Sequence, residues 1–417
     1  MGVGFVDLQM IKQLDEQHCM QNYGRFNVAF DHGKGSFLYD TEGREYIDFA
    51  SGIGVNSIGY GHPRWVEAVS RQAGRLAHVS NLFYTEPYAV LASRLTELTG
   101  MKAVFFANSG AEVNEAAIKL ARKYSRDKYG QGRSVILTLK QSFHGRTLAA
   151  LTATGQSVYH KHFGPFVEGF RYVNSNDLEG LKQAVTPDVC AVMVEAIQGE
   201  GGVIPLEKEY AEALAALAAE RDILLIFDEV QTGNGRTGYM YCYQEFGVEP
   251  DLVTTAKGLG GGLPIGALLA NDKCSGVLAQ GTHGSTFGGN PIACAGANAV
   301  LDIITADGFL EQVRRKGEKI RRTAAGWGLP VIKDIRGKGL MIGIQMAGEG
   351  NTQKEGEISQ ERGKGVKEMA ADLLEQGLVV LTAGSNVLRL LPPLTITDGE
   401  IDSGLAILHR YLAELCQ

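Results

Sequence analysis

The stretch DLVTTAKGLGGGLPIGALLA, residues 251–270, predicts two short buried strands joined by a glycine-rich loop. Its ends, 251–256 and 265–270, are near-continuous apolar runs of strand length. Between them stands a single lysine, Lys257, followed by five glycines within nine residues. A cation placed directly after a buried strand needs a functional or structural reason, because burying a charge is costly unless the charge has a partner.

Similar apolar runs recur through the middle of the chain, and helical patterns at 112–124 and 210–220 lie between them. Such alternation predicts an α/β fold with a mostly parallel sheet covered on both faces. In that architecture ligands bind at the carboxyl ends of the strands, so the residues directly after each run matter most. The other predicted strands are 103–108, 134–139, 191–197 and 223–229.

The pattern changes after about residue 302 and predicts a second, smaller α+β domain. A hairpin expected at 35–50 joins this domain from the N-terminal side. The predicted division is an N-terminal segment of the small domain (1–60), a large domain (61–304) and a C-terminal small domain (305–417). The elements expected in the last part are a helix at 308–325, a strand at 339–346, a polar loop at 348–365, a helix ending at 376, and strands at 378–383 and 387–393.

Composition narrows the function classes. The 417 residues are 44% apolar and carry a formal net charge of −7 without a basic stripe, so nucleic acid is not an expected partner. No run reaches the ~18 apolar residues of a membrane span, and the N-terminus lacks a secretory signal, which predicts a cytoplasmic protein without membrane contact. The six cysteines are scattered, so reduced thiols are expected rather than disulfides or a metal site.

Polar residues follow several of the predicted strands. Asp228 ends the run at 223–228, where a carboxylate needs a cationic or donor partner. Backbone N–H groups around Asn108, Ser109, Gly110 and Ala111, between a strand and a helix, could cradle a phosphate. Taken alone, each of these features is more simply explained as a turn or a helix cap.

A further loop, SFHGRT at 142–147, offers an aromatic ring in Phe143 and a planar carboxylate-binding fork in Arg146. Together with Lys257, Asp228 and the phosphate cradle, it makes the residue set that a pyridoxal 5′-phosphate site requires. Desolvated Lys257 would form the Schiff base, and Asp228 would keep the pyridine nitrogen protonated. A nicotinamide dehydrogenase and a non-catalytic binding protein are the alternatives, but GLGGGL at 258–263 lacks the third glycine and the distant acid of a dinucleotide loop.

The order and spacing of seven motifs resemble those of the class III aminotransferases, which are fold type I pyridoxal phosphate enzymes. The motifs are GREYIDFASGIGVNSIGYGHP (43–63), NSGAEVNEAAIKLAR (108–122), FHGRTLAALTATG (143–155), EAIQGEGGVIP (195–205), FDEVQTGNGRTG (227–238), TTAKGLGGGLPIGA (254–267) and GSTFGGNP (284–291). The resemblance implies that Lys257 and Asp228 are catalytic and that Phe143 stacks on the cofactor. It also implies a homodimer with shared sites, because Thr286 matches a residue that reaches the phosphate of the neighbouring subunit. The other residues it assigns to the cofactor are Ser109, Gly110, Ala111, Val230 and Gln231.

Within this family the chain most resembles the acetylornithine aminotransferases of arginine biosynthesis. The resemblance implies transfer of the distal amine of N2-acetylornithine to 2-oxoglutarate in two half-reactions. Arg146 then grips a substrate carboxylate, Arg389 binds the second carboxylate of glutamate, and Glu200 pairs with Arg389 when that site is not needed. Tyr23, Ile53 and Ser285 are the other residues assigned to the substrate.

The chain departs from the pattern of its relatives at three positions, and other activities remain as alternatives. Ile53 stands where ornithine aminotransferases carry tyrosine, which makes free ornithine a poorer candidate and leaves 4-aminobutyrate as the nearest rival. Ala196 replaces a common proline, and Ala111 replaces a common threonine of the phosphate cradle. An aminomutase, which shifts an amine within one molecule, is the alternative from a different reaction class.

Overall fold

The apolar runs form one seven-stranded sheet in the computed structural model, which describes residues 7–348 and 364–417. The strand order is β4-β12-β11-β10-β7-β5-β6, and only β12 runs antiparallel to its neighbours. The prediction of a mostly parallel sheet is confirmed. The strands are β4 (Ala103–Ala107), β5 (Val135–Leu139), β6 (Phe170–Val173), β7 (Val189–Glu195), β10 (Leu224–Asp228), β11 (Leu252–Thr255) and β12 (Gly266–Ala270).

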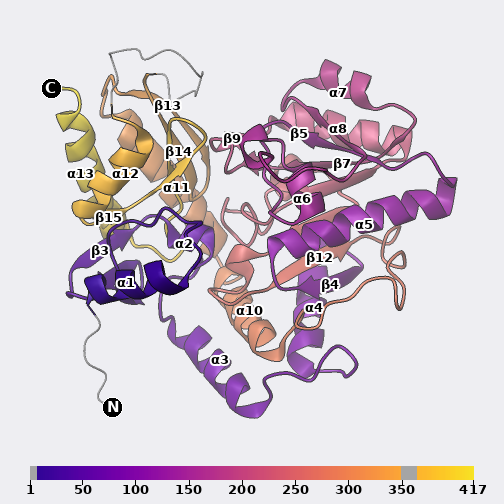
Figure 1. The fold of residues 1–417 in the computed structure, drawn as a ribbon, viewed down its shortest axis with the longest axis horizontal. Coiled ribbons are helices and arrows are strands. Elements are labelled where there is room, and N and C mark those ends of the chain that lie inside the picture. Colours follow the sequence, from indigo (N-terminus) through magenta and orange to yellow (C-terminus); the bar gives the residue numbers. More distant parts are fainter. Residues whose placement is uncertain (1–6, 349–363) are drawn as a thin grey trace.

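Both faces of this sheet are buried, which explains why its strands read as continuous apolar runs. Along β10, Leu225 and Phe227 belong to one core cluster, whereas Leu224 and Ile226 belong to the other. Two of the helices covering the sheet are α5 (Gly110–Tyr129) and α8 (Lys208–Arg221), which contribute to opposite clusters (Figure 1).

α5 is longer than the predicted helix because caps fix both of its ends. The Ser109 hydroxyl accepts the N–H of Glu112 and starts the helix, and Gly130, at a φ of 79°, ends it. β6 escaped prediction because Arg171 and Tyr172 interrupt its apolar pattern and are exposed. The remaining elements of this lobe are α3 (Pro63–Arg75), α4 (Glu86–Thr99), α6 (Leu148–Ala153), α7 (Leu178–Ala184), α9 (Tyr243–Phe246), α10 (Pro291–Ile304), β8 (Ile197–Gln198), β9 (Ile204–Pro205) and the short 3-10 turns η1 (Ser157–Tyr159) and η2 (Lys257–Leu259).

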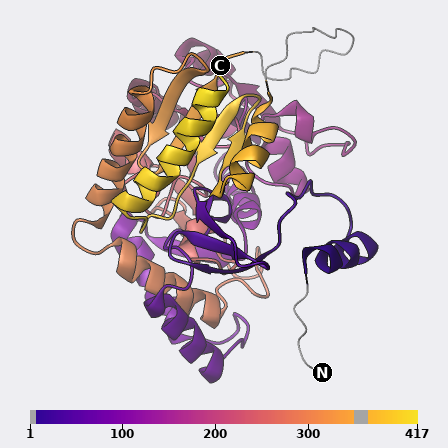
Figure 2. The ribbon, with the colours of Figure 1, turned by 90° about the vertical axis from the view of Figure 1, so that its left-hand side faces the viewer.

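The second lobe contains two four-stranded sheets, β1-β2-β3-β15 and β13-β14-β17-β16. The predicted N-terminal hairpin is β2 with β3, and β15 pairs with β3 in parallel, so the two ends of the chain share one sheet. Figure 2 shows the orange and yellow C-terminal helices above the indigo hairpin. The elements are β1 (Phe30–Lys34), β2 (Phe37–Asp40), β3 (Glu45–Asp48), β13 (Ile332–Lys338), β14 (Met341–Met346), β15 (Leu378–Val379), β16 (Leu381–Ala383), β17 (Val387–Leu390), α1 (Leu8–His18), α2 (Ser51–Gly54), α11 (Phe309–Ala325), α12 (Val366–Glu375) and α13 (Asp398–Glu414).

The C-terminal elements follow the prediction with two differences. The run at 378–383 is divided into β15 and β16, and the polar sequence of β13 gave no strand signal. The polar loop predicted at 348–365 lies almost wholly outside the described residues. The domain boundaries after residues 60 and 304 remain predictions.

Within the described part of the chain, no single helix has both the length and the apolar composition needed to cross a membrane. α10 and α11 meet these criteria only when joined, and they are bent by 73° at their junction.

Candidate active site

A cavity of about 430 Å³ opens where the parallel strands of the large sheet end. Asn108 follows β4, Phe143 follows β5, and Glu195 and Asp228 end β7 and β10. Lys257 enters the cavity after β11. Asn108, Phe143, Asp228 and Lys257, which the sequence singled out, therefore line one cavity together with Glu195, as expected for this architecture.

Lys257 begins η2 with a φ of 40°, in the left-handed region that non-glycine residues seldom adopt. Burial lowers the pKa of its ammonium group, and the nearby cation of Arg389 acts in the same direction. Most of the glycines after Lys257 are required by close packing around the loop and do not line the cavity. A Cβ at Gly260 would lie 2.1 Å from the carbonyl oxygen of Leu263, and Gly262 is the one member of the run that lines the cavity.

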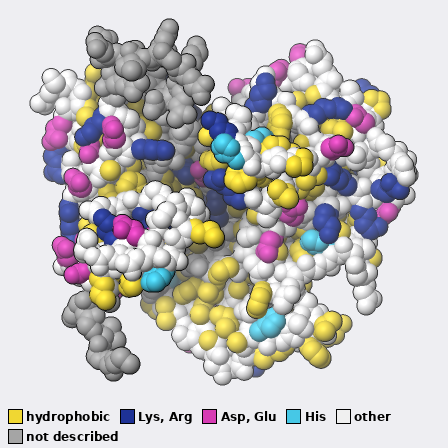
Figure 3. All heavy atoms as spheres, viewed as in Figure 1, with side chains coloured by type: hydrophobic (Ala, Val, Ile, Leu, Met, Phe, Trp, Pro, Cys, Tyr) yellow, Lys and Arg dark blue, Asp and Glu magenta, His cyan; other side chains and the backbone are white. Residues whose placement is uncertain are grey.

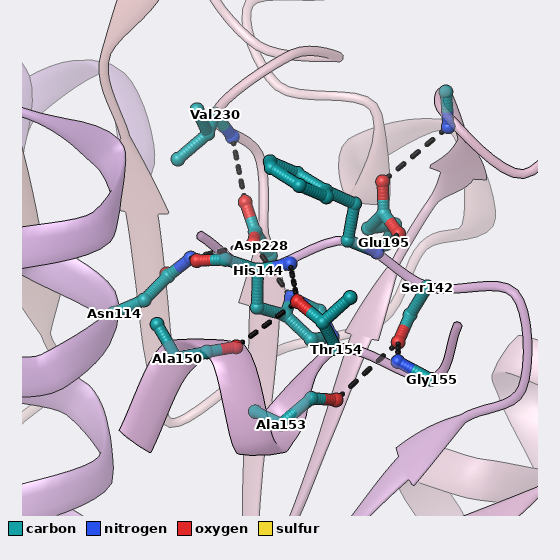
Figure 4. Close-up of polar contacts among 12 residues, drawn as sticks. Asn114, Ser142, His144, Ala150, Ala153, Thr154, Gly155, Glu195, Asp228 and Val230 are labelled. Carbon is teal, nitrogen blue, oxygen red and sulfur yellow. Dashed lines mark hydrogen bonds and ion pairs between the residues drawn. The ribbon is translucent and has the colours of Figure 1, made fainter. Parts of the chain in front are cut away.

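Asp228 is held by three donors (Figure 4). Its Oδ2 accepts from Asn114 Nδ2 and His144 Nδ1, each at 2.8 Å, and its Oδ1 accepts from the N–H of Val230 at 3.0 Å. Burial disfavours a charge on His144, but the hydrogen bond to Asp228 and the carboxylate charges around it outweigh burial and raise its pKa. The result is a buried carboxylate of fixed orientation at the cavity wall.

Glu195 connects two loops of the cavity. Its oxygens accept the N–H of Phe143 at 2.8 Å and that of Gly199 at 3.3 Å. Burial raises its pKa to about 7, with Asp228 acting in the same direction. The loop that carries Phe143 and His144 is fixed from the other side by Thr154, whose hydroxyl accepts the N–H of His144 (Figure 4).

The first turn of α5 carries the residues predicted to form an anion cradle. The Ser109 hydroxyl accepts a hydrogen bond from the N–H of Glu112, and the Ser109 carbonyl oxygen accepts one from the N–H of Val113. The N–H groups of Gly110 and Ala111, the first of the helix, have no partner within the helix, and both residues line the cavity. A Cβ at Gly110 would lie 2.6 Å from Val230 Cγ1, so glycine is required by packing against Val230.

Arg389, on β17 of the small lobe, joins the site from a distant part of the sequence. Its Nη1 lies 2.6 Å from Glu200 Oε1 and donates to Gln231 Oε1 at 2.9 Å. Gln231 in turn donates to Glu200. Burial disfavours the charge on Glu200, but Arg389 outweighs it and lowers the Glu200 pKa.

Arg146, unlike Arg389, lines the cavity itself. Its guanidinium carbon lies 4.2 Å from the ring centroid of Tyr159 and 5.6 Å from that of Phe143. Unlike Arg389, it forms no ion pair with any acid of residues 7–348 and 364–417. Its guanidinium is therefore available to an anion.

Six of the predicted residues do not line the cavity of this single chain. Glu200 and Arg389 contact its wall through Gln231, and the other four are Tyr23, Ile53, Ser285 and Thr286. Tyr23, Ile53 and Thr286 are exposed and are not part of its wall. Ser285 contacts the wall indirectly, since its hydroxyl oxygen accepts from Asn108 Nδ2 at 3.3 Å. Val55, two residues after Ile53, occupies the wall instead.

Three buried residues of the site were missed from the sequence. His144, Asn114 and Glu195 stand in the sequence only as members of longer motifs and were assigned no role of their own. The strand-end rule could have found Glu195, because it is the last residue of β7. His144 and Asn114 have no signal of their own, because their importance comes from Asp228, which is 84 and 114 residues away in the sequence.

The comparisons with known proteins agree over nearly the whole chain. The family described as Aminotransferase class-III matches residues 19–412. An acetylornithine aminotransferase from Haemophilus ducreyi is 50% identical, covering 97% of this chain and 99% of that protein. The structure of an ornithine aminotransferase from Toxoplasma gondii is 31% identical with a TM-score of 0.91, covering 98% and 96% of the two chains. That of an N-acetylornithine aminotransferase from Stenotrophomonas maltophilia is 35% identical with a TM-score of 0.81, covering 96% and 98%.

Proposed function

The chain belongs to the class III aminotransferases, and from this we propose that it transfers the distal amino group of N2-acetylornithine to 2-oxoglutarate. The products are N-acetylglutamate semialdehyde and glutamate, and the pathway is arginine biosynthesis. Relatives named acetylornithine aminotransferase, 41–50% identical along nearly the whole chain, support this substrate. A cytoplasmic location is part of the proposal, and the six unpaired cysteines favour it.

The residues of the cavity fit pyridoxal 5′-phosphate. The free N–H groups of Gly110 and Ala111 suit its phosphate, and the carboxylate of Asp228, fixed by three donors, suits a protonated ring nitrogen. Phe143 lines the same cavity, and Lys257 offers the amine that would hold the cofactor. When bound, this cofactor supplies an electron sink for the reacting carbon.

Lys257 is the residue that would move protons. Burial lowers the pKa of its ammonium group, so Nζ gives up a proton more readily than an exposed lysine does. Asp228 cannot rotate without breaking hydrogen bonds to His144 and Asn114, so its charge stays at one point of the wall. In this proposal Lys257 carries the proton, and Asp228 supplies a charge that stays in one place.

The observation that carries the substrate proposal is the contrast between the two arginines. Arg146 is free to bind the carboxylate that every substrate carries, whereas Arg389 is neutralised by Glu200 at 2.6 Å. A monocarboxylate such as N2-acetylornithine leaves this pair intact. Glutamate and 2-oxoglutarate have a second carboxylate that can replace Glu200, so one cavity accepts both classes without burying an unpaired guanidinium.

A homodimer with shared sites is part of the same proposal. α1 has no buried residue and stands apart from the body of the chain (Figure 2). Figure 3 shows hydrophobic side chains gathered on the lower part of the molecule, near α3. Leu82, Phe83 and Tyr84, between α3 and α4, are exposed, as is Phe287 beside Thr286. A second copy would cover this surface, and a solution mass of one chain at working concentration would contradict the proposal.

The test of the substrate is the first half-reaction alone. The protein loaded with pyridoxal 5′-phosphate is mixed with N2-acetylornithine, ornithine or 4-aminobutyrate without any keto acid, and the loss of the yellow absorbance is timed. The proposal expects the fastest loss with N2-acetylornithine. If the absorbance is lost faster with 4-aminobutyrate or ornithine, that compound is the amino donor instead of N2-acetylornithine. If a donor is converted but added 2-oxoglutarate gives no glutamate, the protein is an aminomutase.

A further inference from the structure

The most strained backbone near the site is the four-residue turn α2. Its residues Ser51, Gly52, Ile53 and Gly54 all have positive φ values, of 48°, 59°, 66° and 75°. They form a left-handed helical turn, closed by hydrogen bonds from Gly54 N to Ala50 O and from Val55 N to Ser51 O. Glycine tolerates this conformation, but serine and especially β-branched isoleucine do not, so other contacts must impose it.

Asp48, the last residue of β3, supplies those contacts. Its carboxylate is buried and accepts the N–H of Ala50 at 2.7 Å and that of Ser51 at 3.0 Å. It also accepts the hydroxyl of Tyr60 at 2.7 Å, which ties the two sides of the turn together. An ionised carboxylate accepts from all three donors at once, which a neutral amide of the same shape cannot do.

The turn positions two parts of the active site. Val55, directly after it, lines the cavity. Ser57 donates from its hydroxyl to the carbonyl oxygen of Gly258 at 2.8 Å, and Gly258 is the residue next to Lys257. Figure 1 shows α2 at the edge of the small lobe that faces the large lobe. The chain from Asp48 to Ser57 is therefore a direct connection between a buried carboxylate and the lysine loop.

We propose that Asp48 is a positioning residue of this enzyme: its carboxylate holds the Ser51–Gly54 turn left-handed and thereby fixes Val55 in the cavity wall and Ser57 against the loop of Lys257. The inference rests on the function proposed for Lys257. It assigns to Asp48 no contact with substrate or cofactor.

The test compares Asp48→Asn with Asp40→Asn. Asp40 is a matched control, because its carboxylate also accepts from two backbone N–H groups of a turn (Glu42 and Arg44) and from a tyrosine hydroxyl (Tyr46), but it lies in the outer hairpin. Two rates are measured at a temperature where all variants are folded. The first is the capture of added pyridoxal 5′-phosphate by the apoprotein, followed by visible absorbance; the second is kcat with the amino donor.

Asp48→Asn is expected to slow capture and lower kcat by ~10-fold each, the factor expected for a lost hydrogen bond to a charged group. Asp40→Asn is expected to leave both rates within ~2-fold of the parent, since its hydrogen bonds stabilise only a surface turn. Unchanged capture and kcat in folded Asp48→Asn, or an equal loss in Asp40→Asn, would overturn the proposal. The capture rate does not depend on the substrate, so a wrong amino donor would change only the second measurement.

A rescue variant separates positioning from general stability. Ser51→Gly removes the positive-φ strain at one position, and the buried Ser51 hydroxyl has no hydrogen-bond partner in the described structure. Added to Asp48→Asn, it is expected to restore most of the capture rate, and a rescue of the melting temperature without one of capture would contradict positioning. If Asp48→Asn does not fold, Ser57→Ala, which keeps the turn but removes the bond to Gly258, takes its place, and it must also slow capture.

Discussion

Replacing Glu195 by glutamine should change how the stability of the protein depends on pH. Burial raises the pKa of this carboxyl from 4.5 to about 7. Below the pKa of the unfolded state, this carboxyl is protonated in both states, so its raised pKa costs no stability. As the pH rises toward the pKa of the folded state, the unfolded chain ionises more readily than the folded one, and the free energy of unfolding falls. At roughly 1.36 kcal/mol per pH unit, its full cost is about 3.4 kcal/mol above pH 7 and roughly 1.4 kcal/mol at pH 5.5.

Glutamine does not titrate, so Glu195→Gln removes only the pH-dependent part of this cost. Relative to the parent, the free energy of unfolding of the variant should rise by about 2 kcal/mol between pH 5.5 and pH 8. Glu195→Gln also lowers the free energy of unfolding by an amount that does not depend on pH, because the amide can accept only one of the N–H groups of Phe143 and Gly199.

The measurement is urea denaturation of both apoproteins across this pH range. Glu229→Gln is the matched variant, because burial also raises the pKa of Glu229 to about 7, while its partners, Thr232 and the N–H of Tyr243, belong to a loop outside the cavity wall. Both variants should show the same trend with pH, but only Glu195→Gln should alter the half-reaction rates. A difference between parent and Glu195→Gln that stays constant from pH 5.5 to pH 8 would refute the reasoning.

Three further predictions concern the reaction. Lys257→Ala should still bind pyridoxal 5′-phosphate but lose turnover by several orders of magnitude, and normal turnover would remove Lys257 from the mechanism. Glu200→Gln leaves Arg389 without a counter-charge, so the half-reaction with N2-acetylornithine should slow by ~10-fold while that with glutamate changes less. Stopped-flow measurement of each half-reaction checks this prediction. Equal effects on the two would contradict the proposal that the second carboxylate of glutamate replaces Glu200. Tyr159→Leu should raise KM for the amino donor by ~2–5-fold because Arg146 loses the ring beneath it, and Tyr159→Phe should not; the same KM in both variants would exclude that contact.

Much of the architecture followed from the sequence for a physical reason. A strand buried on both faces has no polar alternation, so β4, β5, β7, β10, β11 and β12 were visible as apolar runs close to their observed bounds. The half-exposed β6 and the polar β13 lack that signal, and their pairing depends on neighbours distant in sequence. The position of Lys257, Asp228 and Phe143 at one cavity also followed, because parallel strands bring their carboxyl ends to one edge of the sheet.

The sequence by itself thus determined the sheet, the edge at which chemistry occurs, and the family. Only the tertiary structure decided that His144 and Asn114 hold the buried carboxylate of Asp228 and that Asp48 contacts the strained turn Ser51–Gly54, whereas the pairing of Arg389 with Glu200 was already implied by the resemblance. Local patterns register burial and periodicity, which act over a few residues. Compensation of a buried charge depends on groups brought within about 3 Å from anywhere in the chain, and such distances exist only once the fold has formed.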